Sequence, residues 1–456
     1  MHAVGVVLFT RDLRLRDQPA LSAAVAGCEQ IVPAFVVDDA IVARRDVGPN
    51  RWQFLLDSLG SLDDSLRERG SRLVVRCGQW VDEVVRLVES VGADAVFVSD
   101  DYSASARRRL AELQRAATER RFSIEVHEGV TVVPPRQLRT RSGGDYKVFT
   151  PYYRAWLASP WRSRSAGPEH IATPTTVESG AIPQLSELTD GQPSPGLARG
   201  GEDTALAVLR DWSPGMPGYD SGHNDLAADA TSRISAYLHF GCLSALEIAT
   251  LLRDREGGAP FVRQLCWRDF FHQVLDVDPS RAWRDVRPRG DEWDEDDEMF
   301  SAWAQGRTGY PIVDAGMRQL SAEGFMHNRA RMIVASFLTK DLYQDWRRGA
   351  AYFMTLLADA DVACNQLNWQ WVAGTGNDPN AFRVFNPTLQ GRRFDSSGDY
   401  IRRYVAELAG LAADEIHDPP PLVRLATGYP DAIVDHREAL ALYRARRRAS
   451  SGSDAD

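Results

Sequence analysis

The feature that most constrains the fold is a change of hydrophobic pattern near residue 200. Before that point, short runs rich in β-branched residues alternate with amphipathic stretches near 50–69, 80–91 and 103–121. The strand candidates are Val4–Phe9, Ile31–Val37, Leu73–Arg76, Ala95–Ser99 and Ile124–Glu128. Strands that alternate with helices through short connections form a parallel, doubly wound sheet. Residues 1–129 are therefore predicted to form an α/β domain, whose ligands would bind beyond the carboxyl ends of the strands.

Beyond residue 200 the strand signals disappear and apolar residues recur at helical spacing. Examples of such segments are Phe261–Leu275, Ile312–Ala322, Asn328–Leu342 and Trp346–Leu357. Residues 201–446 are predicted to form an all-α domain. Many prolines and glycines interrupt residues 130–200, which favours a long linker with one helix near Pro151–Leu157. The polar residues 447–456 are predicted to be a disordered tail.

Composition narrows the class of protein. Hydrophobic residues make up 44% of the chain, but no run is long enough to span a membrane, and Val4–Phe9 is too short for a signal peptide. A cytoplasmic protein without a membrane partner is expected. The five cysteines are scattered without a CxxC pair, which argues against disulfides, zinc and iron–sulfur clusters, so no metal is expected. The net charge of −10 argues against nucleic-acid binding unless a local basic face exists.

Two motifs could contact a ligand. Thr231–Ser235 offers hydroxyls and backbone N–H groups at a helix start, which suits either a phosphate or an ordinary N-cap. Gln264, Trp267, Arg268 and Phe271 fall on one helix face. A tryptophan beside an arginine and an amide could stack on a base and read its edge, or form a core face with a partly exposed arginine.

Two further motifs are polar where a core is expected. Arg331 shares a helix face with Asn328 and Met332, and Asp359 and Asp361 follow in a short acidic loop. A buried arginine needs a carboxylate partner, so Arg331 is predicted to pair with Asp359, in a site or as a structural salt bridge.

The stretch Asn365–Trp371 places Trp369 and Trp371 on either side of Gln370 within a polar run. Core packing rarely requires two tryptophans in such a setting. The stretch therefore favours a functional interpretation over a purely structural one.

Taken together, these stretches resemble the DNA photolyase/cryptochrome family. The resemblance covers nearly the whole chain and follows an ordered series of segments, namely LFTRDLRLRDQPAL, YKVFTPYYRAW, GYD, TSRISAYLHFGCLS, QLCWRDFFHQ, GRTGYPIVDAGMRQL, MHNRARMIVASFLTKDL, DWRRG, DADVACNQLNWQW and FNPTLQG. It implies an α/β antenna domain, a linker and a helical domain that binds FAD, in agreement with the boundaries above.

The resemblance also implies which residues surround the FAD. Those expected to hold its phosphates and ribitol are Tyr219, Thr231, Ser232, Arg233 and Ser235. Those expected around the isoalloxazine are Arg331 and Asp359 over the ring, Asp361 at the ribityl chain and ring edge, and Asn365 facing N5. Three tryptophans match the family's photoreduction chain, with Trp369 nearest the flavin, then Trp346, then Trp293 at the surface.

The activity implied is light-driven repair of cyclobutane pyrimidine dimers by electron transfer from excited FADH⁻, which makes the chain a carbon–carbon lyase. Its partner would be UV-damaged DNA, with the dimer extruded from the duplex into a pocket. Trp267 and Trp371 resemble the aromatic walls that clasp the dimer, and Asn328 and Met332 its polar and thioether contacts. The expected contacts to lesion or phosphate are Arg268 and Arg383. A monomer without an obligatory protein partner is expected.

The resemblance further suggests a second chromophore. Phe35, Asp38, Arg51 and Asp101 fall where family members that bind 8-hydroxy-5-deazaflavin hold this antenna, which indicates a class I enzyme. The alternatives are 5,10-methenyltetrahydrofolate or no antenna.

The chain departs from the family pattern at two positions. Gln264 stands where dimer photolyases usually carry Glu, so the amide loses a charge and gains two donors. The (6-4) photolyases and some cryptochromes carry Gln there, but the (6-4) enzymes use two histidines where this chain has Asn328 and Met332. Cys364 replaces a small residue such as Ala, with little effect expected. Dimer repair is therefore preferred over (6-4) repair and over a cryptochrome-type photoreceptor without repair activity, whose long C-terminal extension is missing.

Overall fold

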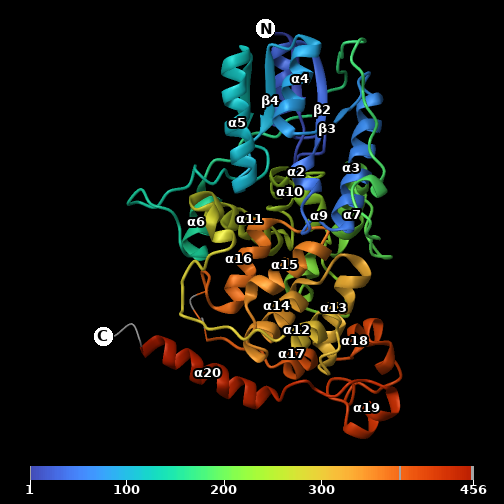
Figure 1. Cartoon of the computed structure of the whole chain (residues 1–456), viewed down its shortest axis with the longest axis vertical. Coiled ribbons are helices and arrows are strands. Elements are labelled where there is room, and N and C mark those ends of the chain that lie inside the picture. The colour runs from blue at the N-terminus through green and yellow to red at the C-terminus, as the bar shows by residue number, and fades with distance from the viewer. Residues whose placement is uncertain (1, 379, 381, 453–456) are drawn as a thin grey trace.

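A computed structural model describes residues 2–378, 380 and 382–452. An α/β domain sits on a larger helical domain, and the connecting segment runs along the side of both (Figure 1). This arrangement confirms the predicted fold class, with a doubly wound parallel sheet followed by an all-α region.

The sheet has five parallel strands in the order β3-β2-β1-β4-β5. Their bounds are β1 His2–Leu8, β2 Cys28–Asp38, β3 Val74–Gly78, β4 Ala95–Ser99 and β5 Ser123–His127. Alternate residues of β1 enter different cores, because Val7 packs with the helices α1 (Pro19–Gly27) and α3 (Pro49–Arg67), whereas Val6 and Leu8 pack with α4 (Trp80–Val91) and α5 (Ala104–Arg120). Both faces of the sheet are thus covered, as parallel sheets require.

The predicted strands all form, but the pattern did not predict two helices of this domain, α1 and α2. Helix α1 was missed because its sequence PALSAAVAG is small and apolar throughout, with no amphipathic alternation. A short helix α2 (Asp39–Val42) follows β2. The strand order reverses between β1 and β4, so the switch point of the sheet lies where these two strands end.

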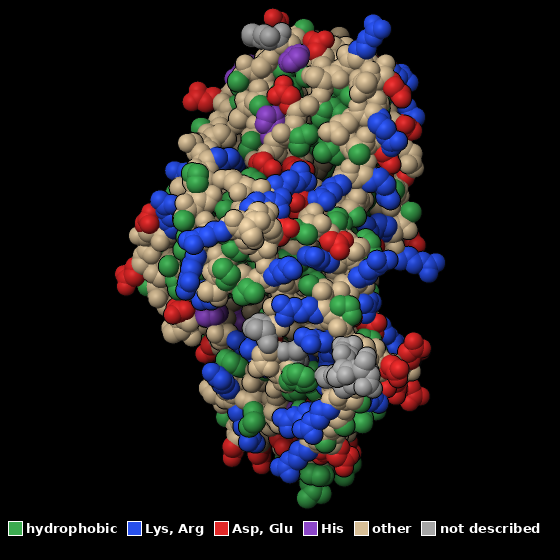
Figure 2. Space-filling view, turned by 90° about the vertical axis from the view of Figure 1, so that its left-hand side faces the viewer, with side chains coloured by type: hydrophobic (Ala, Val, Ile, Leu, Met, Phe, Trp, Pro, Cys, Tyr) green, Lys and Arg blue, Asp and Glu red, His purple; other side chains and the backbone are tan. Residues whose placement is uncertain are grey.

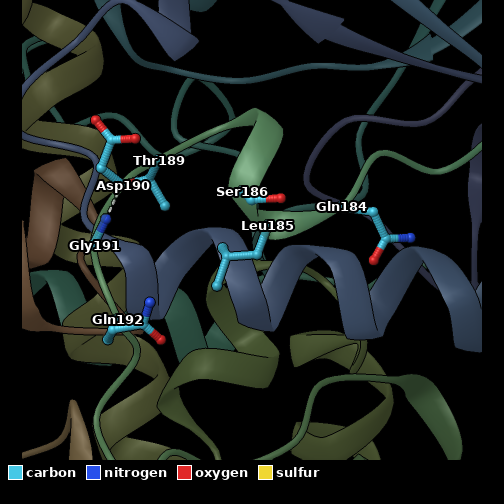
Figure 3. Close-up of a pocket in the computed structure, with 7 residues that line it drawn as sticks. All are labelled: Gln184, Leu185, Ser186, Thr189, Asp190, Gly191 and Gln192. Atoms are coloured by element: carbon cyan, nitrogen blue, oxygen red, sulfur yellow. Dashed lines mark hydrogen bonds between the residues drawn. The ribbon is translucent and has the colours of Figure 1, made fainter.

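The connecting segment holds little regular structure beyond α6 (Phe149–Ala158) and the turn η1 (Leu185–Glu187). Backbone hydrogen bonds tie it to the sheet, from Ile31 N to Ala172 O at 2.7 Å and from Val75 N to Ser179 O at 2.6 Å. Around η1 it borders a polar hollow of about 470 Å³ over α3 (Figure 3). The hollow is lined by Gln184, Leu185, Ser186, Thr189, Asp190, Gly191 and Gln192.

The rest of the described chain is helical. Its elements are α7 Glu202–Trp212, η2 Ser213–Gly218, α8 Tyr219–Gly222, α9 Ser235–His239, α10 Ala245–Leu252, α11 Gly258–Val277, η3 Pro279–Ala282, α12 Asp297–Ala304, α13 Pro311–Glu323, α14 Asn328–Ser336, η4 Phe337–Asp341, α15 Trp346–Leu356, α16 Val362–Ala373, α17 Pro387–Phe394, α18 Asp399–Tyr404, η5 Ala406–Leu408, α19 Pro421–Thr427 and α20 His436–Gly452. Helix α16 packs against α11, α14 and α15 and therefore lies at the centre of this domain. No helix in the described ranges is long and apolar enough to cross a membrane.

The C-terminal end corrects the prediction of a disordered tail over 447–456. Helix α20 continues to Gly452 along the outer edge of the helical domain (Figure 1). Arg447 is buried, donates to Ala373 O at 2.7 Å and lies 3.0 Å from the carboxylate of Asp291. The arginine-rich sequence was expected to be exposed to solvent, because the groups that pair with Arg447 come from segments far away in the sequence. Residues 453–456 lie outside the described residues.

We predict that Arg447→Ala destabilises the protein, because it removes a cation from Asp291, whose side chain is only 2% exposed. An unpaired buried charge costs about 3 kcal/mol or more, so the melting temperature of a chain of this length should fall by about 3 °C or more. Thermal unfolding followed by circular dichroism measures the change. Arg448→Ala is the matched control, because Arg448 is exposed on the same helix; equal melting temperatures for all three proteins would contradict the prediction.

Candidate functional site

The two domains meet at the switch point of the sheet through Arg11, which follows β1. Its guanidinium contacts the carboxylate of Asp361 in the helical domain and lies 3.4 Å from Asp101, which follows β4. Its Nε donates to the carbonyl of His239 at 3.1 Å. The edge of the sheet where a ligand was expected is thus used in part to join the domains. We call Arg11, Asp101, His239, His272 and Asp361 the junction cluster.

Electrostatics in the junction cluster favour a charged Asp361 and neutral histidines. Burial alone would raise the pKa of Asp361, but Arg11, and His272 once its ring is protonated, hold that pKa well below its usual range. Burial, together with the charge of Arg11, lowers the pKa of His239 to about 4. The rings of His239 and His272 approach Asp361 at 3.8 and 3.7 Å. Sequence reasoning missed Arg11, His239 and His272 as site residues, although the motif containing Arg11 follows a predicted strand directly.

The predicted pair of Arg331 and Asp359 is confirmed. The two side chains make a bidentate ion pair with N–O distances of 3.1 and 2.8 Å. Arg331 also donates from Nε to Met326 O at 2.7 Å. The pair fixes α14 to the loop between α15 and α16, because Asp359 lies in that loop.

Helix α16 begins in the junction cluster. Asp361 is its N-cap and accepts a hydrogen bond from Cys364 N at 2.8 Å. Asn365 donates from Nδ2 to Ala350 O of α15 at 3.0 Å. Trp369 follows one turn later on the same face, buried against Phe353 at a ring distance of 5.0 Å.

The other tryptophans of the predicted chain lie in or against the same hydrophobic core. Trp346 is fully buried at the start of α15, and its indole N–H donates to Asp285 at 2.9 Å. Trp369 packs against the same helix at Gly349, where an added Cβ would overlap its indole. Trp293 is half-buried. Trp303, which sequence reasoning did not single out, is buried 6.1 Å from the ring of Trp369.

The hydroxyl-rich loop before α9 does not cap that helix. Its N-cap is Ile234, without a side-chain hydrogen bond, and Ser235 is its first residue. The Thr231 hydroxyl is buried and has no hydrogen-bond partner among the described residues, and Ser232 is buried beside it. A donor left over in this way fits a bound group that carries oxygen acceptors, such as the phosphates or ribitol of a flavin nucleotide.

Two more residues are predicted to hold the flavin. Arg233 belongs to this loop, and Tyr219 is the first residue of α8. Arg233 has a left-handed backbone with φ of 51° and forms ion pairs with Asp229 at 2.7 Å and Glu323 at 2.8 Å. Its charge is thus shared with two carboxylates. Tyr219 is buried at the start of α8, with its ring 5.5 Å from that of Phe261.

Five of the side chains predicted to contact DNA come from the three helices α11, α14 and α16. Gln264 and Asn328 are exposed, and Trp267, Met332 and Trp371 are half-buried. We call these five residues the lesion rim.

Two aromatic contacts support the rim. Trp267 stacks on Phe149 of α6 with ring centroids 3.6 Å apart and planes 4° apart. Arg383 is exposed and places its guanidinium 5.3 Å from the Trp371 ring.

Arg268 differs from the expected contact with lesion or phosphate. Its side chain is 10% exposed and donates to the carbonyls of Val130 at 2.7 Å and Leu238 at 3.3 Å. The guanidinium therefore links the end of the α/β domain to the helical domain. Helical spacing predicted that Arg268 lies beside Gln264 at the surface. The side chain instead turns toward the interior, where it donates to carbonyls that are far away in the sequence.

Of the four predicted antenna residues, Asp38 ends β2 and Asp101 follows β4, so these two lie at the carboxyl edge of the sheet, and both already have ionic partners. Asp38 pairs with Arg109 at 3.2 Å, and Asp101 lies beside Arg11. Phe35 is buried on β2, and burial lowers the pKa of Arg51 on α3 to about 10. Within the described residues, no group of three or more His, Cys, Asp or Glu is arranged to hold a metal.

An α/β domain joined at its switch point to a helical domain through a buried ionic cluster, with half-buried tryptophans on two neighbouring helices, defines a two-domain protein of the photolyase type. The family described as DNA photolyase matches residues 5–174, and the FAD binding domain of DNA photolyase matches residues 261–449. The chain belongs to the DNA photolyase family.

The chain is similar in sequence to individual members of the family along nearly its whole length and theirs. The chain is 47% identical to the deoxyribodipyrimidine photo-lyase of Streptomyces griseus, covering 98% of this chain and 99% of that protein. It is 36% identical to the enzyme of the same name from Escherichia coli K12, covering 97% and 99%.

Solved structures are similar as well. A class III photolyase from Agrobacterium tumefaciens has a TM-score of 0.92 and 34% identity, covering 99% of this chain and 98% of that one. A cryptochrome from Synechocystis has a TM-score of 0.89 and 28% identity, covering 97% and 99%.

The low pKa of His239 gives a pH prediction. In the unfolded chain its pKa is about 6.5, so over the window from about 6.5 down to 4 the unfolded state binds a proton that the folded state does not. Stability should therefore fall as the pH falls through this window. Melting temperatures measured between about pH 7.5 and 5 should decrease, and His239→Asn should make the decrease shallower. The exposed His170, replaced in the same way, should leave the slope unchanged; equal slopes for both variants would contradict the assignment.

Proposed function

We propose that this chain carries out light-driven repair of cyclobutane pyrimidine dimers in DNA, as a carbon–carbon lyase. The observation that carries the proposal is helix α16, which bears Trp371 of the lesion rim, packs against the two helices that bear the other rim residues, and holds Asp361 and Asn365 at its N-terminal end. The full-length identity of 47% to a deoxyribodipyrimidine photo-lyase supports it. We further propose that the protein acts on UV-damaged DNA as a monomer, without an obligatory protein partner.

The proposed cofactor is FAD, in keeping with the match to a FAD binding domain. When bound and reduced, FAD supplies the light-excited electron that splits the dimer. Its phosphate and ribitol portion would be held by Thr231, Ser232, Ser235 and Tyr219. Arg233 would act mainly by shaping this loop, because its guanidinium is already paired with two carboxylates.

The chain's own residues would set the environment of the isoalloxazine. Arg331 and Asp359 hold each other in one orientation and would lie over the ring. Asp361, anionic and fixed by Arg11, would contact the ribityl chain and ring edge. Asn365 donates from its amide N–H₂ to Ala350 O, so its carbonyl oxygen would be left to accept a hydrogen bond from N5 of the reduced flavin.

The lesion rim would receive the extruded dimer. Trp267 and Trp371 would form its aromatic walls, because base–aromatic stacking contributes about 1–3 kcal/mol per base. Gln264 and Asn328 would read pyrimidine edges, and Met332 would add a thioether contact. Arg383 would contact DNA beside Trp371, whereas Arg268 would serve to position α11. Lys and Arg side chains gather across one face of the molecule despite its negative net charge (Figure 2), which suits binding to phosphate.

We propose Trp369, Trp346 and Trp293 as the route by which an electron reaches the flavin from the surface. Burial of the inner two residues and partial exposure of the third support this order. Asp285, hydrogen-bonded to the Trp346 indole, would stabilise positive charge there.

Trp369→Phe tests this route. The variant should lose photoreduction of its oxidised flavin but keep dimer repair once the flavin is reduced chemically, because only the route into the flavin is broken. Absorption spectra under blue light measure the first property, and a dimer-containing oligonucleotide measures the second. Trp303→Phe is the control, since Trp303 touches Trp369 but lies outside the proposed chain. Photoreduction lost only in the control would place the route through Trp303.

For the antenna we propose 8-hydroxy-5-deazaflavin near Phe35, Asp38, Arg51 and Asp101, as in class I enzymes, with 5,10-methenyltetrahydrofolate as the alternative. The position at the carboxyl edge of the sheet supports a ligand there. Absorption and mass spectra of the chromophore released from the purified protein distinguish the two.

A photoreceptor without repair activity is the second candidate, favoured by the similarity to the Synechocystis cryptochrome. Gln264 separates the candidates, because this exposed amide would contact the lesion only in a repair enzyme. Gln264→Glu should keep or improve dimer repair, because a carboxylate accepts the same hydrogen bond with added charge. Repair rates under blue light measure the effect, with the adjacent exposed Arg263→Gln as a control. A large loss in Gln264→Glu would mean that the rim reads another lesion.

A further inference from the structure

A second polar hollow, of about 810 Å³, lies where the α/β domain, the connecting segment and the helical domain meet. Arg16 of its lining comes from the loop after β1, residues 159–167 belong to the connecting segment, and the rest of the lining comes from α10 and from Arg253 directly after it. Among the described residues that line it, none is proposed above for the flavin, the lesion or the antenna. We call this site the arginine hollow.

Positive charge is in excess in the arginine hollow. The described residues of its lining bring one carboxylate, that of Glu247, and four guanidinium groups, those of Arg16, Arg162, Arg164 and Arg253. Arg16 pairs with Glu247 at 2.7 Å, whereas Arg164 lies 3.9 Å from it. Arg253 pairs with Asp254 at 3.1 Å, but that carboxylate is 82% exposed, so water screens the pair. The charges of Arg164 and Arg253 can therefore turn to a bound anion.

Asp17 fixes one wall of the hollow from behind. Its backbone is left-handed with φ of 47°, a conformation that is uncommon outside glycine. Its fully buried carboxylate accepts from both terminal nitrogens of Arg162, at 2.5 and 2.9 Å, and from Ser165 N at 3.1 Å. Its own N–H donates to Ser165 O at 3.0 Å. The wall at Arg162–Ser165 is thus held in place without a ligand, which lowers the entropy cost of binding one.

A cation and an aromatic ring form another wall. The guanidinium of Arg253 lies 5.0 Å from the centroid of the Trp161 ring. Trp161 is half-buried, because its indole N–H donates to Trp156 O at 3.3 Å and its ring meets that of Trp156 edge to face at 4.9 Å. Guanidinium planes and aromatic rings are the surfaces on which proteins stack nucleobases. Together with the excess of cations, this wall favours a ligand that carries both a base and phosphate.

We propose that the arginine hollow binds a nucleoside phosphate, with its phosphates against Arg164 and its base against Arg253 and Trp161. The volume of about 810 Å³ falls within the range of pockets for small ligands, about 300–1,000 Å³. Because three parts of the chain line the hollow, a bound nucleotide would tie the α/β domain to the helical domain. The inference does not depend on the proposed repair, since neither the dimer nor the excited flavin takes part in this binding.

Isothermal titration of the FAD-loaded full-length protein with ADP tests the inference, because its flavin site is already filled. ADP should bind at one saturable site, and adenosine far more weakly. Arg164→Ala should lower the affinity for ADP by about tenfold or more, through the loss of a hydrogen bond between charged groups. Arg253→Ala should lower it by about fivefold or more, because the base loses a stacking plane. Both side chains are exposed, and the exposed Arg255→Ala, outside the lining, is the matched control.

Four outcomes would overturn the inference. The first is a parent protein without saturable binding of ADP. The second is an affinity for ADP that Arg164→Ala and Arg253→Ala leave unchanged, because the nucleotide would then bind elsewhere. The third is equal affinity for ADP and inorganic pyrophosphate, which would mean that no base is recognised. The fourth is a short undamaged single-stranded oligonucleotide that competes with ADP and binds more tightly, because the hollow would then be a DNA contact.

Discussion

The buried contact between Arg11 and Asp361 is the interaction on which the rest of the structure depends. It joins the switch point of the sheet to the first turn of α16, so it fixes how the α/β domain sits on the helical domain. Two buried charges are tolerated there because Asp101 and the carbonyl of His239 share the guanidinium. The same carboxylate caps α16, and one pairing therefore sets both the domain geometry and the orientation of the central helix.

Helix α16 and its neighbours carry the residues that we propose for the flavin site, the electron route and the lesion rim. Asn365 and Trp369 lie on the face of α16 toward α15, while Trp371 belongs to the lesion rim. The proposed route for electrons then passes outward through Trp346 of α15 to Trp293. Helix α20 covers its outer end through Arg446 and Arg447. In this account the C-terminal helix protects the oxidised end of the route and is more than a passive tail.

Sequence patterns predicted the parts whose signals are local. Short runs rich in β-branched residues located the five strands, and helical spacing located the helical domain. The need of a buried arginine for a carboxylate predicted the pair of Arg331 with Asp359. Long-range pairing escaped prediction. The inward turn of Arg268, the burial of Arg447 and the role of Arg11 depend on acceptors far away in the sequence, which no local pattern reveals.

The most direct test of the central claim uses two defined oligonucleotides, one with a thymine cyclobutane dimer and one with a (6-4) product. The purified protein, with its flavin reduced, is exposed to blue light with each, and restored thymines are quantified against dark controls. The account predicts repair of the cyclobutane dimer alone, because the lesion rim offers Asn328 and Met332 and no histidine pair. Repair of neither lesion by protein that holds reducible flavin would contradict it and indicate a photoreceptor.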